Sequence, residues 1–243
     1  MEEKIKIASS PYFLNNYIEI LSSILRRIVK SNDASPGCDK IVTQFHSETA
    51  PSVAIRDYME RILKLTKCEP GSIVLAVIYM LRICRDHSIP LTSLCFHRLF
   101  ITSVCVSMKY FEDDVYSNKY MAKVGGISTR ELSVLERLHL VMLKFSLMMS
   151  PIDYGNFCKE AVRLEGQILL DSVPTKGKKG GASELSNAIA LIARLLPPNP
   201  NASEEKEKEA SPAKEKASSA SSAEKKEKET EPEEEESEKK AAN

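Results

Sequence analysis

The chain has 243 residues, and its 34 basic and 34 acidic side chains leave no formal net charge. Residues 201–243 carry 9 lysines and 14 glutamates, so 25 basic and 20 acidic residues remain before them. That basic excess is too small to indicate nucleic acid as a partner. No apolar run reaches the length that spans a bilayer, about 20 residues, and no secretory signal is evident, so we expect no membrane partner.

The spacing of apolar residues predicts a series of helices. An amphipathic helix covers 11–30, and a second begins at Ser52 with apolar residues at i, i+3, i+4 and i+7 on one face. Pro70 opens a third helix, which ends at residue 86. The fourth, 94–111, is apolar around its whole circumference, which is typical of the buried centre of a helix bundle.

The second half of the chain continues in the same way. Ser128 and Glu131 form a capping box, which opens a helix over 132–147. A last amphipathic segment covers 184–196. No segment alternates with the period of a strand, so the predicted fold class is all-α.

Residues 199–243 are nearly all Glu, Lys, Ala, Ser and Pro. Such a segment buries too little apolar area to offset the entropy of ordering, and it is predicted to be a disordered tail. The six cysteines form no CxxC pair and lie mostly in apolar helical patterns. Buried, reduced thiols of this kind indicate the cytoplasm or the nucleus.

Catalytic chemistry finds little support in the sequence. The four histidines do not have metal-ligand spacing, and the glycine- and lysine-containing stretches lack the order of a phosphate-binding loop. His97 and His139 lie in apolar helices, where a core histidine is the better interpretation. We therefore expect no catalytic residue, no metal and no cofactor.

Two charged residues interrupt apolar helix faces. Lys109 follows Cys105 by four positions on the predicted central helix, and Glu136 lies between Leu132 and Leu140 on an apolar stripe. Burying either charge without a partner costs several kcal/mol. Two explanations stay open: Lys109 reaches water from the end of its helix, or both charges lie at the rim of a surface that meets another protein.

Four stretches resemble the cyclins, specifically the P/U-type cyclins of the PHO group. They read "SVAIRDYMERILKLTKC", "LTSLCFHRLFITSVCVSMKYFEDDVYSN", "YMAKVGGIS" and "ELSVLERLHLVMLKFSLMMSPIDY", in the order and spacing of one cyclin box. The resemblance implies a single five-helix cyclin box over 41–160, with helices from 52, 70, 92, 117 and 129. The expected additions are an N-terminal amphipathic helix and linker (1–40) packed on the outside, a linker and C-terminal helix (161–198), and the tail.

The resemblance also implies a function. Cyclins have no catalytic site; they bind a cyclin-dependent Ser/Thr protein kinase as a heterodimer and hold its αC helix inward. In cyclins, residues matching Lys109 and Glu136 approach each other and contact the kinase backbone. The apolar surface that receives the kinase helix is expected at Tyr110, Leu140, Phe145 and Leu147. Independently, helical spacing predicts Glu136, Leu140 and Leu147 on one side of the 132–147 helix.

Some positions depart from the family pattern. Arg56 matches the arginine of a family salt bridge, but Leu81 stands where its acidic partner is expected. Ile55, Met59 and Ile62 retain a weakened substrate-docking patch, at which we predict no docking.

Ser211 begins a Ser-Pro-x-Lys sequence and is a candidate phosphorylation site. A non-kinase cyclin-fold adaptor or a helical interaction scaffold is the alternative function. The sequence leaves the pathway open between phosphate signalling, the cell cycle and morphogenesis.

Overall fold

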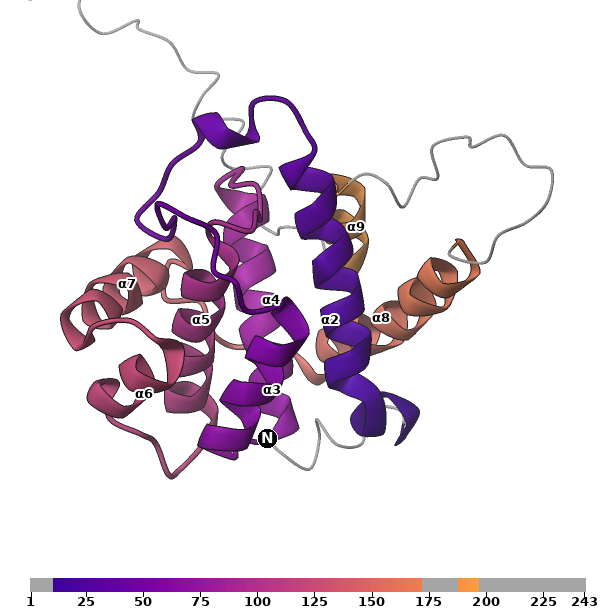
Figure 1. The fold of residues 1–243 in the computed structure, drawn as a ribbon. Helices are drawn as coiled ribbons and strands as arrows, with labels where there is room; N and C mark the ends of the chain where they lie inside the picture. The colour runs from indigo at the N-terminus through magenta and orange to yellow at the C-terminus, as the bar shows by residue number, and fades with distance from the viewer. Residues whose placement is uncertain (1–10, 172–187, 197–243) are drawn as a thin grey trace, which may run out of the picture. The chain divides into compact units, whose positions relative to one another are not determined.

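The computed structural model describes residues 11–171 and 188–196, and the described residues form helices joined by turns and loops (Figure 1). In chain order these are α2 (Pro11–Asp33), η1 (Cys38–Lys40), α3 (Ile55–Thr66), α4 (Pro70–Asp86), α5 (Phe96–Phe111), α6 (Asn118–Gly125), α7 (Thr129–Met142), α8 (Pro151–Asp171) and α9 (Ala188–Leu195). The predicted all-α class is confirmed. Helices α3 to α7 correspond to the five helices expected for the box.

Helices α4 and α5 lie side by side at the centre of the described residues (Figure 1). From Leu99 to Met108 every side chain of α5 is buried, and exposure begins at Lys109 and Tyr110. This agrees with an α5 that is apolar around its circumference. Helices α6 and α7 pack on the α5 side, while α2 and α9 contact α4 and α8 contacts both α2 and α9.

Helix α2 is part of the core and does not pack merely on the outside of the box. Phe13, Ile20, Ile24 and Ile28 are at most 1% exposed. The physical reason is that α2 contacts α3, α4, α8 and α9. An amphipathic pattern predicts that a helix packs on something, but it does not say how many neighbours surround it.

Helix α8 is the largest difference from the sequence analysis. It runs unbroken through residue 160, where the predicted box ends, and therefore 161–171 is helix and not linker. Pro151 opens the helix, and the Ser150 hydroxyl accepts from the Asp153 backbone N–H at 3.0 Å. Its buried side chains follow helical spacing: Tyr154, Phe157, Cys158, Ala161, Leu164 and Ile168.

Helix α7 is shorter than predicted, because it ends at Met142 and not at 147. The N–H of Phe145 bonds to the Leu140 carbonyl and the N–H of Lys144 to the Val141 carbonyl, each at 2.9 Å. This is the Schellman pattern that terminates helices. Leu147 therefore does not lie on the helix that its spacing predicted.

Candidate functional site

Lys109 and Glu136, the two charges singled out in the sequence, are in direct contact. The Lys109 Nζ donates to Glu136 Oε1 at 2.5 Å and to Asn118 Oδ1 at 2.7 Å. The Asn118 Nδ2 donates to Glu136 Oε2 at 2.7 Å and to Ser133 Oγ at 3.2 Å. We call Lys109, Asn118, Ser133 and Glu136 the clasp; it joins the end of α5, the start of α6 and the middle of α7.

Asn118 and Ser133 are residues that the sequence analysis missed. Ser133 and Glu136 are three positions apart on α7, a spacing that places them on one helix face and was available in the sequence. The role of Asn118 left no comparable signal, because it begins a different helix and meets Glu136 only in the folded chain.

The clasp lies at the edge of the packed helices. The Lys109 side chain is 35% exposed and that of Glu136 is 14% exposed. A pair exposed to this degree contributes at most about 1 kcal/mol to stability. The stability that the pair adds is therefore too small to explain its presence at this position. The C-terminal turn of α5 does stabilise the positive charge of Lys109.

Beneath the clasp, Cys105 contacts the same amide. Its Sγ lies 3.7 Å from Asn118 Oδ1. Burial raises the pKa of the Cys105 thiol to about 12, and so the thiol stays protonated and serves as a weak donor. The Asn118 oxygen thus accepts from a charged and a neutral donor together.

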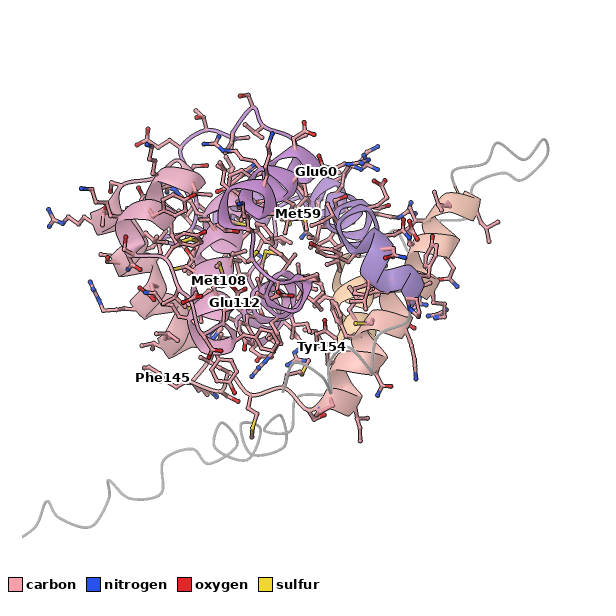
Figure 2. All side chains as sticks on the ribbon, turned by 90° about the horizontal axis from the view of Figure 1, so that it is seen from below. Met59, Glu60, Met108, Glu112, Phe145 and Tyr154 are labelled. Carbon is pink, nitrogen blue, oxygen red and sulfur yellow. The ribbon has the colours of Figure 1, made fainter. Side chains whose placement is uncertain are left out.

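Of the four apolar residues predicted for the surface, Tyr110 and Leu140 lie on the same helices as Lys109 and Glu136, and Phe145 and Leu147 follow α7. Leu140 lies one helical turn beyond Glu136 and accepts the N–H of Phe145 at 2.9 Å. Phe145 is 68% exposed and lies at the periphery in Figure 2, whereas Leu140 and Leu147 are partly buried against the core. Tyr110 follows Lys109 directly and is exposed. We call Tyr110, Leu140, Phe145 and Leu147 the apolar strip.

The comparisons with known proteins identify the family of the chain. A family profile described as "Cyclin" matches residues 15–147, which is more than half of the chain. The chain belongs to the cyclin family. Membership indicates a regulatory subunit of cyclin-dependent kinases, and cyclins in general are regulatory, non-catalytic proteins.

Individual relatives carry P- and U-type names. Cyclin-U4-1 of Arabidopsis thaliana is 40% identical over 155 residues, which cover 61% of this chain and 75% of the relative. Cyclin-P3-1 of Oryza sativa subsp. japonica is 37% identical over 155 residues, with 63% and 66% covered. Cyclin-P4-1 of the same rice is 36% identical over 148 residues, with 58% and 70% covered. The predicted P/U-type cyclin is thereby confirmed.

In this cyclin the weakened docking patch is closed. Met59 and Ile62 are fully buried and Ile55 is partly buried, because α2 packs against α3. The Arg56 guanidinium forms ion pairs with the carboxylates of Glu19 in α2 at 2.5 Å and Glu60 at 2.8 Å.

Leu81, where an acid was expected as the partner of Arg56, is itself fully buried. In the family pattern that salt bridge joins two helices of the box. Here Arg56 instead ties α3 to α2 through Glu19.

The two helical histidines are core residues. His97 Nε2 lies 2.9 Å from the Val53 carbonyl, and His139 Nε2 lies 2.7 Å from Ser103 Oγ. Burial lowers the pKa of both rings, that of His139 to about 3. Among the described residues, no group of three or more His, Cys, Asp or Glu side chains has a metal-binding arrangement.

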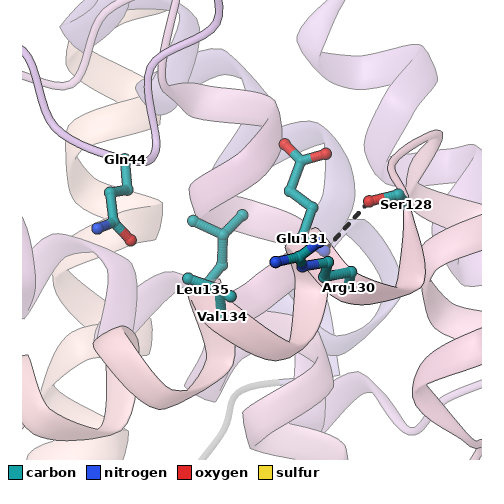
Figure 3. Close-up of a pocket in the computed structure, with 6 residues that line it drawn as sticks. All are labelled: Gln44, Ser128, Arg130, Glu131, Val134 and Leu135. Atoms are coloured by element: carbon teal, nitrogen blue, oxygen red, sulfur yellow. Dashed lines mark hydrogen bonds between the residues drawn. The ribbon is translucent and has the colours of Figure 1, made fainter.

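A shallow hollow of about 290 Å³ lies at the N-terminal end of α7, lined by Gln44, Ser128, Arg130, Glu131, Val134 and Leu135 (Figure 3). The Ser128 hydroxyl accepts from the Glu131 backbone N–H at 3.1 Å, as the capping box predicts. The Glu131 carboxylate pairs with Arg98 at 2.7 Å. None of the residues predicted for the functional surface lines this hollow.

Ser211 and the predicted tail lie outside the described residues. Within the described part of the chain, none of the helices combines the length and apolar character needed to cross a bilayer. All six cysteines are free, and every one except Cys38 is buried.

Proposed function

We propose that this cyclin binds a cyclin-dependent Ser/Thr protein kinase as a heterodimer and stabilises its active conformation by holding the αC helix inward. That helix carries the glutamate that pairs with the ATP-anchoring lysine, so its position controls phosphoryl transfer. The observation that carries the proposal is the polar clasp at one end of a partly exposed apolar strip.

The chemistry of this surface suits an amphipathic helix. Helix-in-groove recognition needs apolar contacts with polar groups at their rim. The strip supplies the former, and its neighbours Val141 and Met148 are 59% and 74% exposed. Among the described residues, the Lys109 ammonium bonds to Glu136 and Asn118, which leaves one of its three protons for a backbone carbonyl of the kinase.

Affinity capture of the full chain followed by mass spectrometry tests the proposal. The captured kinase is then assayed with the wild type, Lys109→Ala and Glu136→Ala. Each substitution is expected to weaken kinase binding by about 1–3 kcal/mol, because each removes charge-assisted hydrogen bonds. Lys123→Ala, an exposed lysine of α6, is the matched control.

The outcomes test the assigned site and the kinase-binding function separately. Full binding and activation by both clasp variants would overturn the site. Capture of other proteins without any kinase would favour the alternative, a non-kinase cyclin-fold adaptor or scaffold.

Two smaller proposals accompany this function. Free cysteines that are mostly buried support a location in the cytoplasm or the nucleus, which imaging of a tagged chain tests. We also propose that the bound kinase phosphorylates Ser211, which begins a Ser-Pro-x-Lys sequence. Phosphosite mapping that finds Ser211 unmodified after incubation with the active complex would remove that proposal.

A further inference from the structure

The turn that follows α7, residues 143–147, has an unusual backbone. Lys144 and Phe145 have φ values of +51° and +55°, in the left-handed region. Residues with a Cβ avoid this region, and glycine is the usual residue at the first of these positions in a helix-ending motif. Neither position is glycine here, so other contacts must hold the turn in place.

Three side chains of the α4 segment supply those contacts, each through a backbone carbonyl. The Tyr79 hydroxyl donates to the Leu147 carbonyl at 2.6 Å, and Arg82 Nη1 donates to the Ser146 carbonyl at 2.9 Å. His87, just beyond the helix, donates from Nε2 to the Met142 carbonyl at 2.9 Å.

Tyr79 is fully buried. Burial, with a smaller contribution from nearby Tyr110, raises the pKa of its hydroxyl, which therefore stays protonated and keeps donating.

The result is a turn whose backbone is fixed while its central side chain points outward. Leu143 is buried and Leu147 is partly buried, so both ends of the turn are anchored in the core. Phe145 between them is 68% exposed. Packing does not require an exposed phenylalanine in a strained backbone; such strain is typical of sites that contact a partner.

We propose that Tyr79, Arg82 and His87 are positioning residues that hold the 143–147 turn so that Phe145 is presented in a fixed place to the kinase helix. This rests on the proposed function and deepens it. A turn that is already ordered loses less conformational entropy on binding, and that raises affinity without any new contact. Tyr79 itself is buried beneath the turn, so its effect on affinity acts through Phe145.

Tyr79→Phe in the full chain is the test, because it removes one hydroxyl and keeps the ring. The Lys144 and Phe145 amides donate to carbonyls at the end of α7, and the Ser146 and Leu147 amides donate to carbonyls within the turn. Hydrogen exchange of these four amides therefore reports on the turn in the free protein. We expect their exchange to rise about threefold to tenfold and affinity for the captured kinase to fall by a similar factor. In a Phe145→Ala background, adding Tyr79→Phe should not weaken binding further.

Tyr58→Phe is the matched control, since the Tyr58 hydroxyl also donates to a carbonyl, that of Gly125 at 3.0 Å, but away from the turn. It should leave turn exchange and affinity unchanged. Arg82→Gln provides a second variant, which removes the bond to Ser146 and should act in the same direction as Tyr79→Phe.

Three results separate this proposal from the proposed function. Unchanged exchange of the turn amides in both α4 variants overturns the positioning role. Raised exchange with unchanged affinity, while Phe145→Ala weakens binding, overturns the link to recognition. If the wild type captures no kinase, the proposed function fails, and raised exchange in the free variants still supports the positioning of the turn by α4.

Discussion

Asn118 uses both ends of its amide to join the two charged residues of the clasp. Its oxygen accepts from Lys109, and its nitrogen donates to Glu136 and Ser133. An asparagine fits because this position needs an acceptor and donors on one short side chain. An aspartate would place a second carboxylate beside Glu136, and an alanine would remove every bridging bond.

His139 is the buried residue with the clearest dependence on pH. Its ring is fully buried, and Ser103 Oγ already donates to the Leu99 carbonyl, so the His139 Nε2–H donates to Ser103. Its Nδ1 has no hydrogen-bond partner among the described residues. Burial therefore opposes protonation and lowers the pKa from 6.5 to about 3.

The sign of the pH effect follows from that lowered pKa. Below pH 6.5 the unfolded chain binds a proton at His139 that the folded chain does not, so stability present above 6.5 is lost as pH falls toward 3. Between pH 7 and pH 5 we expect wild type to lose about 2 kcal/mol more free energy of unfolding than His139→Leu. Urea unfolding at both pH values measures this difference.

His46 and His97, whose pKa values are also lowered by burial, remain in the His139→Leu variant and leave it a smaller pH dependence of the same sign. Equal losses in the wild type and the variant would contradict the assignment to His139.

At the scale of elements, the two members of the glycine pair at the end of α6 have different roles. A Cβ at Gly125 would lie 2.6 Å from Ile101 Cγ1, and Ile101 is fully buried in α5. Gly126 has open space around it but a φ of +75°, as the residue that ends α6. The same dipeptide therefore serves close packing at one position and backbone conformation at the next.

Gly125→Ala is expected to lower the free energy of unfolding by about 1–3 kcal/mol, because α6 must move away from α5. Gly166→Ala is the matched control: this glycine lies in α8 with nothing within 4 Å of an added Cβ. Alanine there should be neutral or stabilise by about 0.5–1 kcal/mol through helix propensity. Thermal unfolding of both variants measures the contrast, and similar effects at the two sites would contradict the packing argument.

The N-terminus of α4 shows a second link between elements. The Glu112 carboxylate, just beyond α5, accepts from the Glu69 backbone N–H at 3.0 Å and from the Ser72 hydroxyl at 2.5 Å. A negative charge is stabilised at this end of a helix, where backbone N–H groups lack internal partners. Glu112, in the acidic run after α5, thus provides the acceptor for two hydrogen-bond donors at the start of α4, some forty residues earlier in the chain.

At the scale of the described residues as a whole, α2 belongs to the same core as the box helices. The Asn32 side chain donates to the Leu91 carbonyl at 2.9 Å, and Asp33 accepts the Ser93 backbone N–H at 3.0 Å. On the other side, Arg194 of α9 pairs with Glu160 of α8 at 3.1 Å. The predicted boundaries at residues 40 and 160 therefore both cut through packed structure.

A fragment of residues 41–160 is consequently expected not to fold cooperatively. Truncating one buried aliphatic side chain costs about 2–5 kcal/mol, and α2 contributes many of them against a total stability of about 5–15 kcal/mol. A chain ending at residue 199, which keeps all described residues, is the control and should unfold in one transition. Near-UV circular dichroism and dye binding distinguish the two; a cooperative transition of the 41–160 fragment would contradict this expectation.

The sequence by itself determined most of the helices and the family. Helix-period spacing and capping residues are local, so α2 to α5 and α7 were predictable from them. The short α6 was expected only from the cyclin resemblance, which the order of the sequence blocks carried. The pairing of Lys109 with Glu136 came from that resemblance, since spacing alone left two explanations open.

Only the tertiary structure decided the place of Asn118, the early end of α7, the burial of α2 and the continuation of α8 past residue 160. Each depends on contacts between residues far apart in the chain, such as Tyr79 with Leu147, and no local pattern encodes those distances.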